Sequence, residues 1–262
     1  MQNTREGIPP ARVDTVRFPA LCAHRGLSGL LPESSMASFE AAVALGADEM
    51  EFDIRLTADK RLIICHDPKA DRISTGEGKI AEMTLGQLRA LQLISPIDHL
   101  PTQSVFAVPQ EVFEAFGGRI VMNIHFKDLG ADTAFAVGEM TGLARHNALE
   151  QSVYFATSEE ETMRCFARQA PDIMHCALEP WREDLDIVDF ALRYGCPRCQ
   201  LFKGVFDREK VERALKAGLI CNVFWADDEP TAREYLDMGI SVLLTNRTDR
   251  LLELRDEYRR KQ

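Results

Sequence analysis

The sequence has no long apolar run and no concentration of positive charge. No stretch approaches the roughly 20 apolar residues needed to cross a bilayer, and the N-terminal residues lack the apolar segment of a secretory signal. The formal net charge of −10 repels nucleic acids and other polyanions, and no basic stripe offsets it. We therefore expect a cytoplasmic protein that binds no nucleic acid and does not insert stably into a membrane.

The sequence also lacks internal repeats, low-complexity tracts and a dense cysteine framework. Its seven cysteines are scattered over the chain, which favours a reducing compartment. The pair Cys196 and Cys199 has C-x-x-C spacing, but no second such pair accompanies it. We interpret this pair as a chance spacing near the start of a strand, not as half of a zinc site or a redox pair.

The 262 residues suffice for one large domain, and a β/α barrel of about 250 residues is a common size for one. We expect a flexible N-terminal lead-in over residues 1–17 and a single domain over residues 18–262. Short β-rich runs alternate with amphipathic helical segments, which argues for a parallel β/α architecture. The expected strands cover residues 20–24, 49–55, 61–66, 119–126, 152–157, 173–179, 198–202, 220–226 and 241–245. The expected helices between them cover residues 35–44, 111–116, 132–146, 159–170, 185–194, 207–217 and 229–238.

These nine strands are one more than an eight-stranded barrel needs. Only residues 57–60 separate the 61–66 run from the strand before it, which is too short for a parallel crossover. We therefore expect a hairpin-like excursion that brings His66 beside Glu51 and Asp53. The predicted fold class is α/β, a (β/α)8 TIM barrel with a small insertion after the third strand run, over residues 68–110 and above the catalytic face.

Polar residues end several of these apolar segments. His24 and Arg25 follow one expected strand, Glu51 and Asp53 lie in the next, and His66 follows a third. Burying such groups costs several kcal/mol unless they are paired or bind an ion. Carboxylates bind divalent cations, histidines move protons near neutral pH, and an arginine grips phosphate oxygens. The pattern predicts a site that acts on a phosphate group.

In chain order, these residues resemble the glycerophosphodiester phosphodiesterase family. The similar motifs are His24-Arg25-Gly26, Pro32-Glu33, Glu51-Phe52-Asp53, Leu56-Thr57-Ala58-Asp59 and His66-Asp67-Pro68. The likeness continues over residues 71–88 and returns more weakly at residues 123–127, 223–225 and 244–247. The resemblance implies a barrel fold, one divalent metal ion, and hydrolysis of a small glycerophosphodiester to glycerol 3-phosphate and an alcohol.

The resemblance and the residue chemistry together assign roles. His24 and His66 form a catalytic pair of proton donor and acceptor, while Arg25 and Lys127 bind the substrate phosphate. Glu33 is expected to orient Arg25.

Two further residues complete the expected catalytic face. Trp225 either lines the pocket for the leaving group or closes the barrel mouth. The metal ligands are Glu51, Asp53 and His125. The resembling enzymes typically carry glutamate at position 125, and they favour Mg²⁺ or Ca²⁺; an imidazole ligand shifts the preference towards Mn²⁺ or Zn²⁺.

Further departures from the family pattern leave alternatives open. Ala156-Thr157 stands where serine and phenylalanine are common, and Asn246 replaces a frequent aspartate. A catalytically silent barrel that binds a phosphate or a metabolite, or a related phospholipase acting on another phosphodiester, would share the same fold. A homo-oligomer is also left open.

Overall fold

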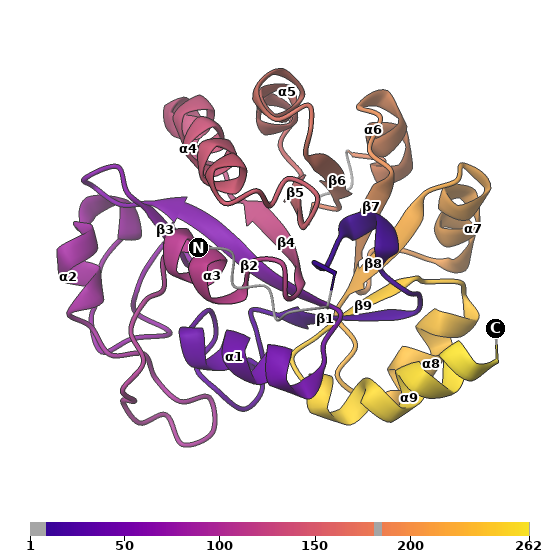
Figure 1. Ribbon diagram of the computed structural model, residues 1–262, viewed down its shortest axis with the longest axis horizontal. Coiled ribbons are helices and arrows are strands. Elements are labelled where there is room, and N and C mark those ends of the chain that lie inside the picture. Colours follow the sequence, from indigo (N-terminus) through magenta and orange to yellow (C-terminus); the bar gives the residue numbers. More distant parts are fainter. Residues whose placement is uncertain (1–8, 181–184, 262) are drawn as a thin grey trace.

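Eight parallel strands close into a barrel in this computed structural model, which describes residues 9–180 and 185–261 (Figure 1). Their order is β1-β9-β8-β7-β6-β5-β4-β2, and pairing of β1 with β2 closes the barrel. These strands are β1 (Ala20–His24), β2 (Glu49–Leu56), β4 (Val121–Phe126), β5 (Val153–Thr157), β6 (Met174–Leu178), β7 (Arg198–Phe202), β8 (Ile220–Phe224) and β9 (Val242–Thr245). The predicted (β/α)8 TIM barrel is thereby confirmed.

Helices surround the barrel and cover the outer face of its strands (Figure 1). They are α1 (Met36–Leu45), α3 (Pro109–Phe116), α4 (Thr133–His146), α5 (Glu160–Gln169), α6 (Ile187–Arg193), α7 (Arg208–Lys216), α8 (Glu229–Asp237) and α9 (Thr248–Arg260), while α2 (Leu85–Arg89) lies outside this ring. Local sequence sets their ends. In α1, for example, Ser35 and Ser38 form a reciprocal cap at the N-terminus, and Gly46 ends the helix at φ 82°.

Successive side chains along a strand point to opposite sides. One set packs against the surrounding helices in the apolar core, and the other set points into the barrel and is largely polar. In β4, Met122, Ile124 and Phe126 belong to the large core cluster that includes residues of the surrounding helices. Asn123 and His125 point to the opposite side because successive strand residues alternate, and both are buried. The strand therefore contributes packing outside the barrel and polar chemistry inside it.

The extra strand β3 (Leu62–Ile64) pairs antiparallel with β2, as expected for a hairpin-like excursion. Ile64 lies opposite Ile54, and the Cys65 amide donates a hydrogen bond to the Asp53 carbonyl at 3.0 Å. His66 therefore follows at the level of Asp53.

Residues 68–110 pack against β3 around a second apolar cluster, and Figure 1 shows α2 beside β3 at the edge of the barrel. The buried members of this cluster are Ile63, Cys65, Ala70, Ile73, Ile80, Leu88, Leu93 and Phe106. The segment reaches the catalytic face through Arg72, which contacts Asp67 and Glu33.

The N-terminal segment packs against the opposite end of the barrel. Val13 is buried against Val121 and Tyr154, and its amide donates a hydrogen bond to the Gln151 carbonyl at 2.8 Å. This packing differs from the flexible lead-in expected over residues 1–17, of which residues 1–8 lie outside the described part.

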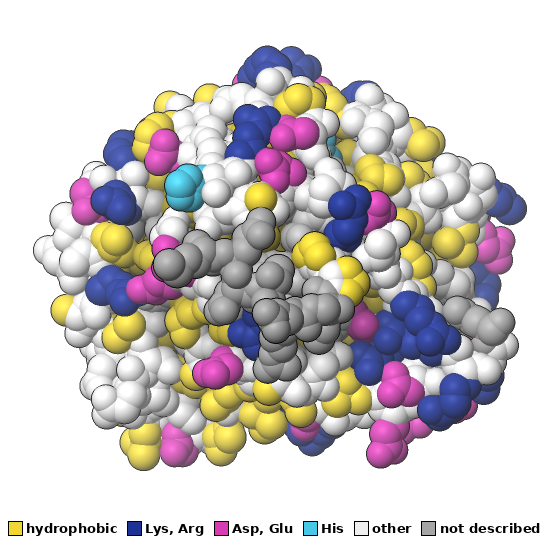
Figure 2. All heavy atoms as spheres, viewed as in Figure 1, with side chains coloured by type: hydrophobic (Ala, Val, Ile, Leu, Met, Phe, Trp, Pro, Cys, Tyr) yellow, Lys and Arg dark blue, Asp and Glu magenta, His cyan; other side chains and the backbone are white. Residues whose placement is uncertain are grey.

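The surface on this side of the molecule carries both signs of charge. Figure 2 shows Lys and Arg side chains interspersed with Asp and Glu, and hydrophobic side chains scattered between them. Among the helices of the described residues, none combines the length and apolar character that crossing a membrane requires.

Candidate active site

Four of the expected site residues meet because parallel strands end at the same edge of the barrel. His24 is the last residue of β1 and lies beside Glu51 of β2. Asp53, two residues further along β2, lies beside His125 of β4. Active sites of β/α barrels lie at this C-terminal edge, so the fold places the predicted cluster where barrel enzymes carry out their chemistry.

Glu51, Asp53 and His125 form a compact buried cluster whose potential ligand atoms all lie within 4.8 Å of one another. His125 Nδ1 lies 2.9 Å from Glu51 Oε1 and 3.6 Å from Asp53 Oδ1. No other group of three His, Cys, Asp or Glu side chains is arranged this closely within the described residues. The isolated pair Cys196 and Cys199 belongs to no such group, and both thiols are buried.

The oxygens of this cluster suit a cation. Within the described part of the chain, Glu51 Oε1 and both Asp53 carboxylate oxygens are buried, and no hydroxyl or backbone amide donates to them. Lys127 Nζ lies 2.7 Å from Asp53 Oδ1, and Arg25 Nε lies 3.6 Å from Asp53 Oδ2. Two carboxylates and an imidazole are a fitting ligand set for a divalent ion of the transition series.

These positive neighbours also set the charge of the carboxylates. Burial alone would raise the pKa of Asp53, but the charge of Lys127, the hydrogen bond from His125 and the charge of Arg25 hold it well below its usual range. Burial and Asp53 act to raise the pKa of Glu51, yet His125 and His24 lower it below its ordinary value. Both groups are therefore ionised at neutral pH, as metal ligands must be.

His125 is held from both sides of its ring. Burial lowers its pKa, but the charges of Glu51 and Asp53 and the hydrogen bonds to them more than offset this and raise it to about 9. On the other side, Gln200 Nε2 lies 3.0 Å from His125 Nε2, and Gln200 Oε1 accepts a hydrogen bond from Asn123. Gln200 thus fixes the plane in which Nδ1 faces the carboxylates.

His24 is buried beside the cluster, with its Nε2 3.8 Å from Glu51 Oε2. Its Nδ1 lies 2.8 Å from Asn246 Oδ1. Burial, together with the charge of Arg25, lowers the pKa of His24 below its ordinary value. The imidazole is therefore neutral at neutral pH and can accept a proton.

His66 lies at the more open side of the site, where 36% of its side chain is exposed. Its Nδ1 lies 2.6 Å from Asp67 Oδ1, and Arg72 Nε donates to Asp67 Oδ2 at 2.5 Å. Burial raises the pKa of Asp67, but the hydrogen bonds from Arg72 and His66 bring it to about 2. Burial lowers the pKa of His66, which the charge of Asp53 partly opposes.

Arg25 is aimed by the turn after β1. Gly26 has φ 78°, and a Cβ there would lie 2.4 Å from Ser38 Oγ, so the turn requires glycine. Arg25 Nη1 donates to Glu33 Oε1 at 3.0 Å, which is the contact expected of a residue that orients it. Arg72 donates to both Glu33 oxygens, at 2.7 and 2.8 Å, and so links the Arg25 side of the site to the His66 side.

Aromatic side chains border the site on the β8 side. Trp225 follows this strand, with its ring 6.0 Å from that of Phe202, and Lys203 Nζ lies 5.8 Å from the Trp225 ring centre. The neighbouring Phe224 ring lies 6.2 Å from the His24 ring and 6.4 Å from the His125 ring. Phe224 thus lies beside both histidines.

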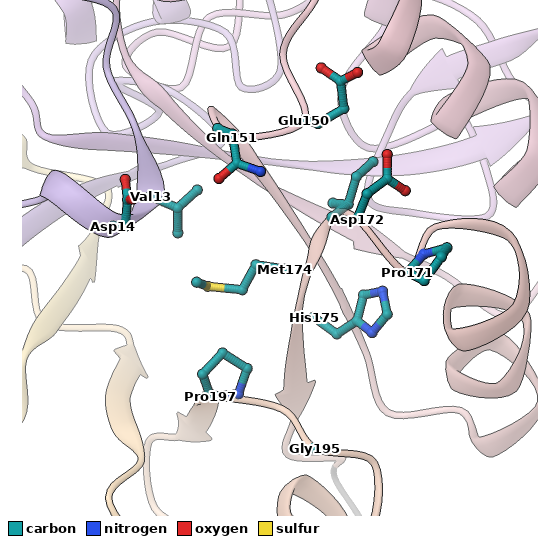
Figure 3. Close-up of a pocket in the computed structure, with 11 residues that line it drawn as sticks. Val13, Asp14, Glu150, Gln151, Pro171, Asp172, Met174, His175, Gly195 and Pro197 are labelled. Atoms are coloured by element: carbon teal, nitrogen blue, oxygen red, sulfur yellow. The ribbon is translucent and has the colours of Figure 1, made fainter.

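A cavity of about 340 Å³ lies at the other end of the barrel (Figure 3). Met174, which begins β6, and Pro197, which precedes β7, line it together with Val13 and His175. None of the expected site residues lines this cavity. Because it opens beside the N-terminal ends of the strands, it is separate from the catalytic edge.

Several residues that support the site have no role among the predictions made from the sequence. Asp67 and Arg72 lie within the segments that resemble the family, and Asp67 directly follows His66, which was a usable signal. Gln200 and Asp227 had no such signal. They stand in the β7 strand and the β8 loop, and only the barrel brings them to His125 and Asn246.

The chain is a parallel β/α barrel with buried carboxylates and histidines at its C-terminal edge, which is the arrangement found in barrel enzymes. The sequence matches the model of the glycerophosphoryl diester phosphodiesterase family over residues 24–250, and the chain belongs to this family. It is 30% identical over 220 residues to a glycerophosphodiester phosphodiesterase of Caldanaerobacter subterraneus subsp. tengcongensis, covering 75% of this chain and 90% of that one. A Bacillus subtilis glycerophosphodiester phosphodiesterase is 27% identical over 271 residues, covering 96% and 89%.

Solved structures show the same fold. A putative glycerophosphoryl diester phosphodiesterase from Silicibacter pomeroyi matches with a TM-score of 0.85 at 18% identity, covering 95% of this chain and 98% of that one. An Oleispira antarctica phosphodiesterase in complex with the product sn-glycerol-3-phosphate matches with a TM-score of 0.80 at 20% identity, covering 87% and 93%. The expected enzyme class, the phosphoric diester hydrolases, is confirmed by these relatives.

Proposed function

We propose that this protein hydrolyses a glycerophosphodiester to glycerol 3-phosphate and an alcohol, with the help of one divalent metal ion. The observation that carries the proposal is the buried cluster of Glu51, Asp53 and His125 with His24 beside it. The names of the relatives support the substrate class, and the Oleispira antarctica phosphodiesterase was solved with the product sn-glycerol-3-phosphate.

Glu51, Asp53 and His125 would hold the metal. When bound, it polarises the phosphoryl oxygens and offsets the charge that develops in the transition state. The imidazole in this ligand set favours Mn²⁺ or Zn²⁺ over Mg²⁺ or Ca²⁺.

Arg25 and Lys127 bind the substrate phosphate. Both lie against Asp53, and Glu33 holds the Arg25 guanidinium by an ion pair at 3.0 Å. A planar guanidinium can grip two phosphate oxygens at once, while the Lys127 ammonium adds a point charge. With the anion present, these cations offset its charge in a protein whose net charge is −10.

His24 and His66 move the protons. His24 is buried and neutral, and its Nε2 accepts the proton of the attacking group, the vicinal hydroxyl of the substrate's glycerol. This attack expels the alcohol and forms a cyclic phosphate, which a water molecule then opens to glycerol 3-phosphate. His66 donates a proton to the leaving alkoxide. Burial lowers its pKa, but Asp67 on its Nδ1 and the negative charge of the substrate phosphate stabilise the charged ring that this role requires. Trp225 and Phe202 form an aromatic wall beside the site, where we place the leaving alcohol.

The test is hydrolysis of a panel of glycerophosphodiesters with choline, ethanolamine, glycerol or inositol as the leaving alcohol. The protein is first treated with chelator and then reloaded with Mg²⁺, Ca²⁺, Mn²⁺ or Zn²⁺, and glycerol 3-phosphate is measured. Turnover that chelator removes and one metal restores supports the proposal. A protein that binds metal but releases glycerol 3-phosphate from none of these diesters would instead be a silent barrel.

A further inference from the structure

Asp227, in the loop after β8, is a partly buried carboxylate without a place in the reaction described above. Its Oδ1 accepts hydrogen bonds from the Asn246 amide at 2.7 Å and from Thr245 Oγ1 at 3.0 Å. Its Oδ2 accepts one from Asn246 Nδ2 at 2.7 Å. Asn246 in turn lies between this carboxylate and His24, whose Nδ1 is 2.8 Å from Asn246 Oδ1.

Hydrogen-bond donors must face acceptors, and this leaves one arrangement for Asp227, Asn246 and His24. An ionised carboxylate only accepts hydrogen bonds, so the NH₂ end of the Asn246 amide must face Asp227. The carbonyl end must then face His24, and a carbonyl only accepts. His24 Nδ1 must therefore carry a hydrogen, and in the neutral ring Nε2 keeps a lone pair. Ser28 Oγ lies 2.7 Å from the His24 carbonyl oxygen and 2.8 Å from Asn246 Oδ1, and its single hydrogen can be donated to either oxygen.

We propose that Asp227 is a positioning residue that acts through Asn246 to fix His24 as the tautomer with Nδ1 protonated. Its consequence for catalysis rests on the proposed function, because Nε2 of this tautomer is the atom that accepts the proton. The tautomer itself does not depend on that function.

This role of Asp227 differs from that of a residue that only anchors the loop. It depends on the negative charge of Asp227 and on the direction of the hydrogen bonds from Asn246 to Asp227 and from His24 to Asn246. An amide at position 227 could present either its oxygen or its NH₂ to Asn246. The Asn246 amide could then turn, its NH₂ would face His24, and the hydrogen of the imidazole would move to Nε2. In that tautomer His24 cannot accept a proton at Nε2.

The experiment compares three variants. Asp227→Asn removes the charge at nearly constant shape. The double variant Asn246→Asp/Asp227→Asn exchanges the two groups: the carboxylate at 246 accepts directly from His24 Nδ1, while the amide at 227 donates to it and accepts from the backbone and Thr245. Asp249→Asn is the matched control, because Asp249 is a carboxylate in the first turn of α9, three positions after Asn246, that pairs with Arg247 and takes no part in these hydrogen bonds.

Two readouts are measured on protein loaded with a diamagnetic divalent ion. The ¹⁵N chemical shifts of His24 report its tautomer directly. The pH profile of kcat reports its proton transfer. Besides Asn246, the groups that act on the charge of His24 are Arg25, Glu51 and Asp53, and all of them are unchanged in these variants.

We expect the Nδ1-protonated tautomer in the native chain and a mixture in Asp227→Asn. Its kcat should fall by about 10- to 100-fold, less than the about 10²–10⁴-fold typical of losing a general base altogether. The double variant should recover the native tautomer and most of kcat. Its acid limb should move to higher pH because a carboxylate beside Nδ1 stabilises the imidazolium. Asp249→Asn should match the native chain.

A native tautomer and a native kcat in Asp227→Asn would overturn the proposal. A double variant that folds but has His24 protonated at Nε2 would also overturn it. This second result decides the question even if Asp227→Asn alone does not fold. If no diester is hydrolysed by the native chain, the proposed function fails while the ¹⁵N shifts still decide the tautomer.

Discussion

His125 Nδ1 lies 2.9 Å from Glu51 Oε1, which places an imidazole in direct contact with a buried carboxylate. Glu51 and Asp53 raise the pKa of His125 to about 9 despite its burial. Without a metal, His125 therefore carries the positive charge that the two carboxylates need. A metal ion that binds through Nδ1 must displace this proton, since a histidine binds metal only in its neutral form.

Metal affinity should consequently rise with pH over a wide range. Because the pKa is raised, His125 stays protonated up to about pH 9, and each metal ion bound below that pH releases a proton. The apparent affinity should increase about tenfold per pH unit towards pH 9. Calorimetric titration with Mn²⁺ at several pH values, in buffers of different ionisation enthalpy, measures both the affinity and the proton release.

His125→Glu is the matched variant for this measurement. It removes the imidazole proton, so the slope should flatten, and its oxygen-only ligand set should favour Mg²⁺ or Ca²⁺ more than the native site does. The same pH slope and the same metal preference in both proteins would show that His125 is not a ligand.

Gln200→Leu tests whether the ring of His125 is held for metal binding. The Gln200 amide lies 3.0 Å from His125 Nε2, and its oxygen is the end that can accept from the Nε2–H of a protonated or metal-bound ring. Loss of such an outer partner typically lowers metal affinity by about 10- to 100-fold. Gln200→Glu keeps a polar partner that can accept from the Nε2–H of a metal-bound ring, so its affinity should be at least native. If both variants bind Mn²⁺ like the native chain, the contact has no role in metal binding.

The strands of the barrel could be predicted because each is an apolar run that a helix and often a glycine separate from the next. Even the extra strand β3 followed from the short connection between it and β2. The meeting of His24, Glu51 and His125 also followed, since parallel strands bring their C-terminal ends together.

The sequence could not show contacts between side chains that lie far apart in the chain, because no sequence pattern marks such pairs. His24 and Asn246 are 222 positions apart, and Asp227 reads as an ordinary loop aspartate. Val13 is one apolar residue in a polar segment, so its burial against the barrel could not be read from that segment. These contacts form only when the barrel closes and brings distant segments together.

Truncation of either catalytic histidine should abolish most turnover. His24→Ala and His66→Ala should each lower kcat by about 10²–10⁴-fold, the usual contribution of a general acid or base. Metal content and thermal stability are compared alongside kcat. The exposed His146 of α4 gives the control His146→Ala, which should behave like the native chain. A near-native kcat in either variant would assign that histidine a structural role.

Arg25→Lys should impair the enzyme although it keeps the charge. Lysine cannot reproduce the fork that pairs with Glu33 and can hold two phosphate oxygens. We expect kcat/KM for the preferred diester to fall by at least about tenfold, the effect of losing one strong hydrogen bond to a charged group. Arg72→Lys, one contact further out, serves as comparison and should lose less. An unchanged kcat/KM in Arg25→Lys would remove Arg25 from the phosphate site.

Arg198 and Glu49 form a fully buried ion pair at 2.8 Å inside the barrel, below the site. The Tyr154 hydroxyl also donates to Glu49 at 2.6 Å, and the Arg198 guanidinium stacks 4.6 Å from the Tyr154 ring centre. Removing one partner of such a pair leaves the other charge buried and unpaired.

Arg198→Leu should therefore lower the free energy of unfolding by about 3–5 kcal/mol, the usual cost of breaking a buried pair from one side. The double variant Arg198→Leu/Glu49→Leu removes both charges and should recover much of that loss, because burying two charges is itself costly. Urea unfolding of the native chain, the two single variants and the double variant gives the coupling energy between the two residues. Additive losses in the double variant would mean that Arg198 stabilises the barrel through its packing on Tyr154 and not through the charge of Glu49.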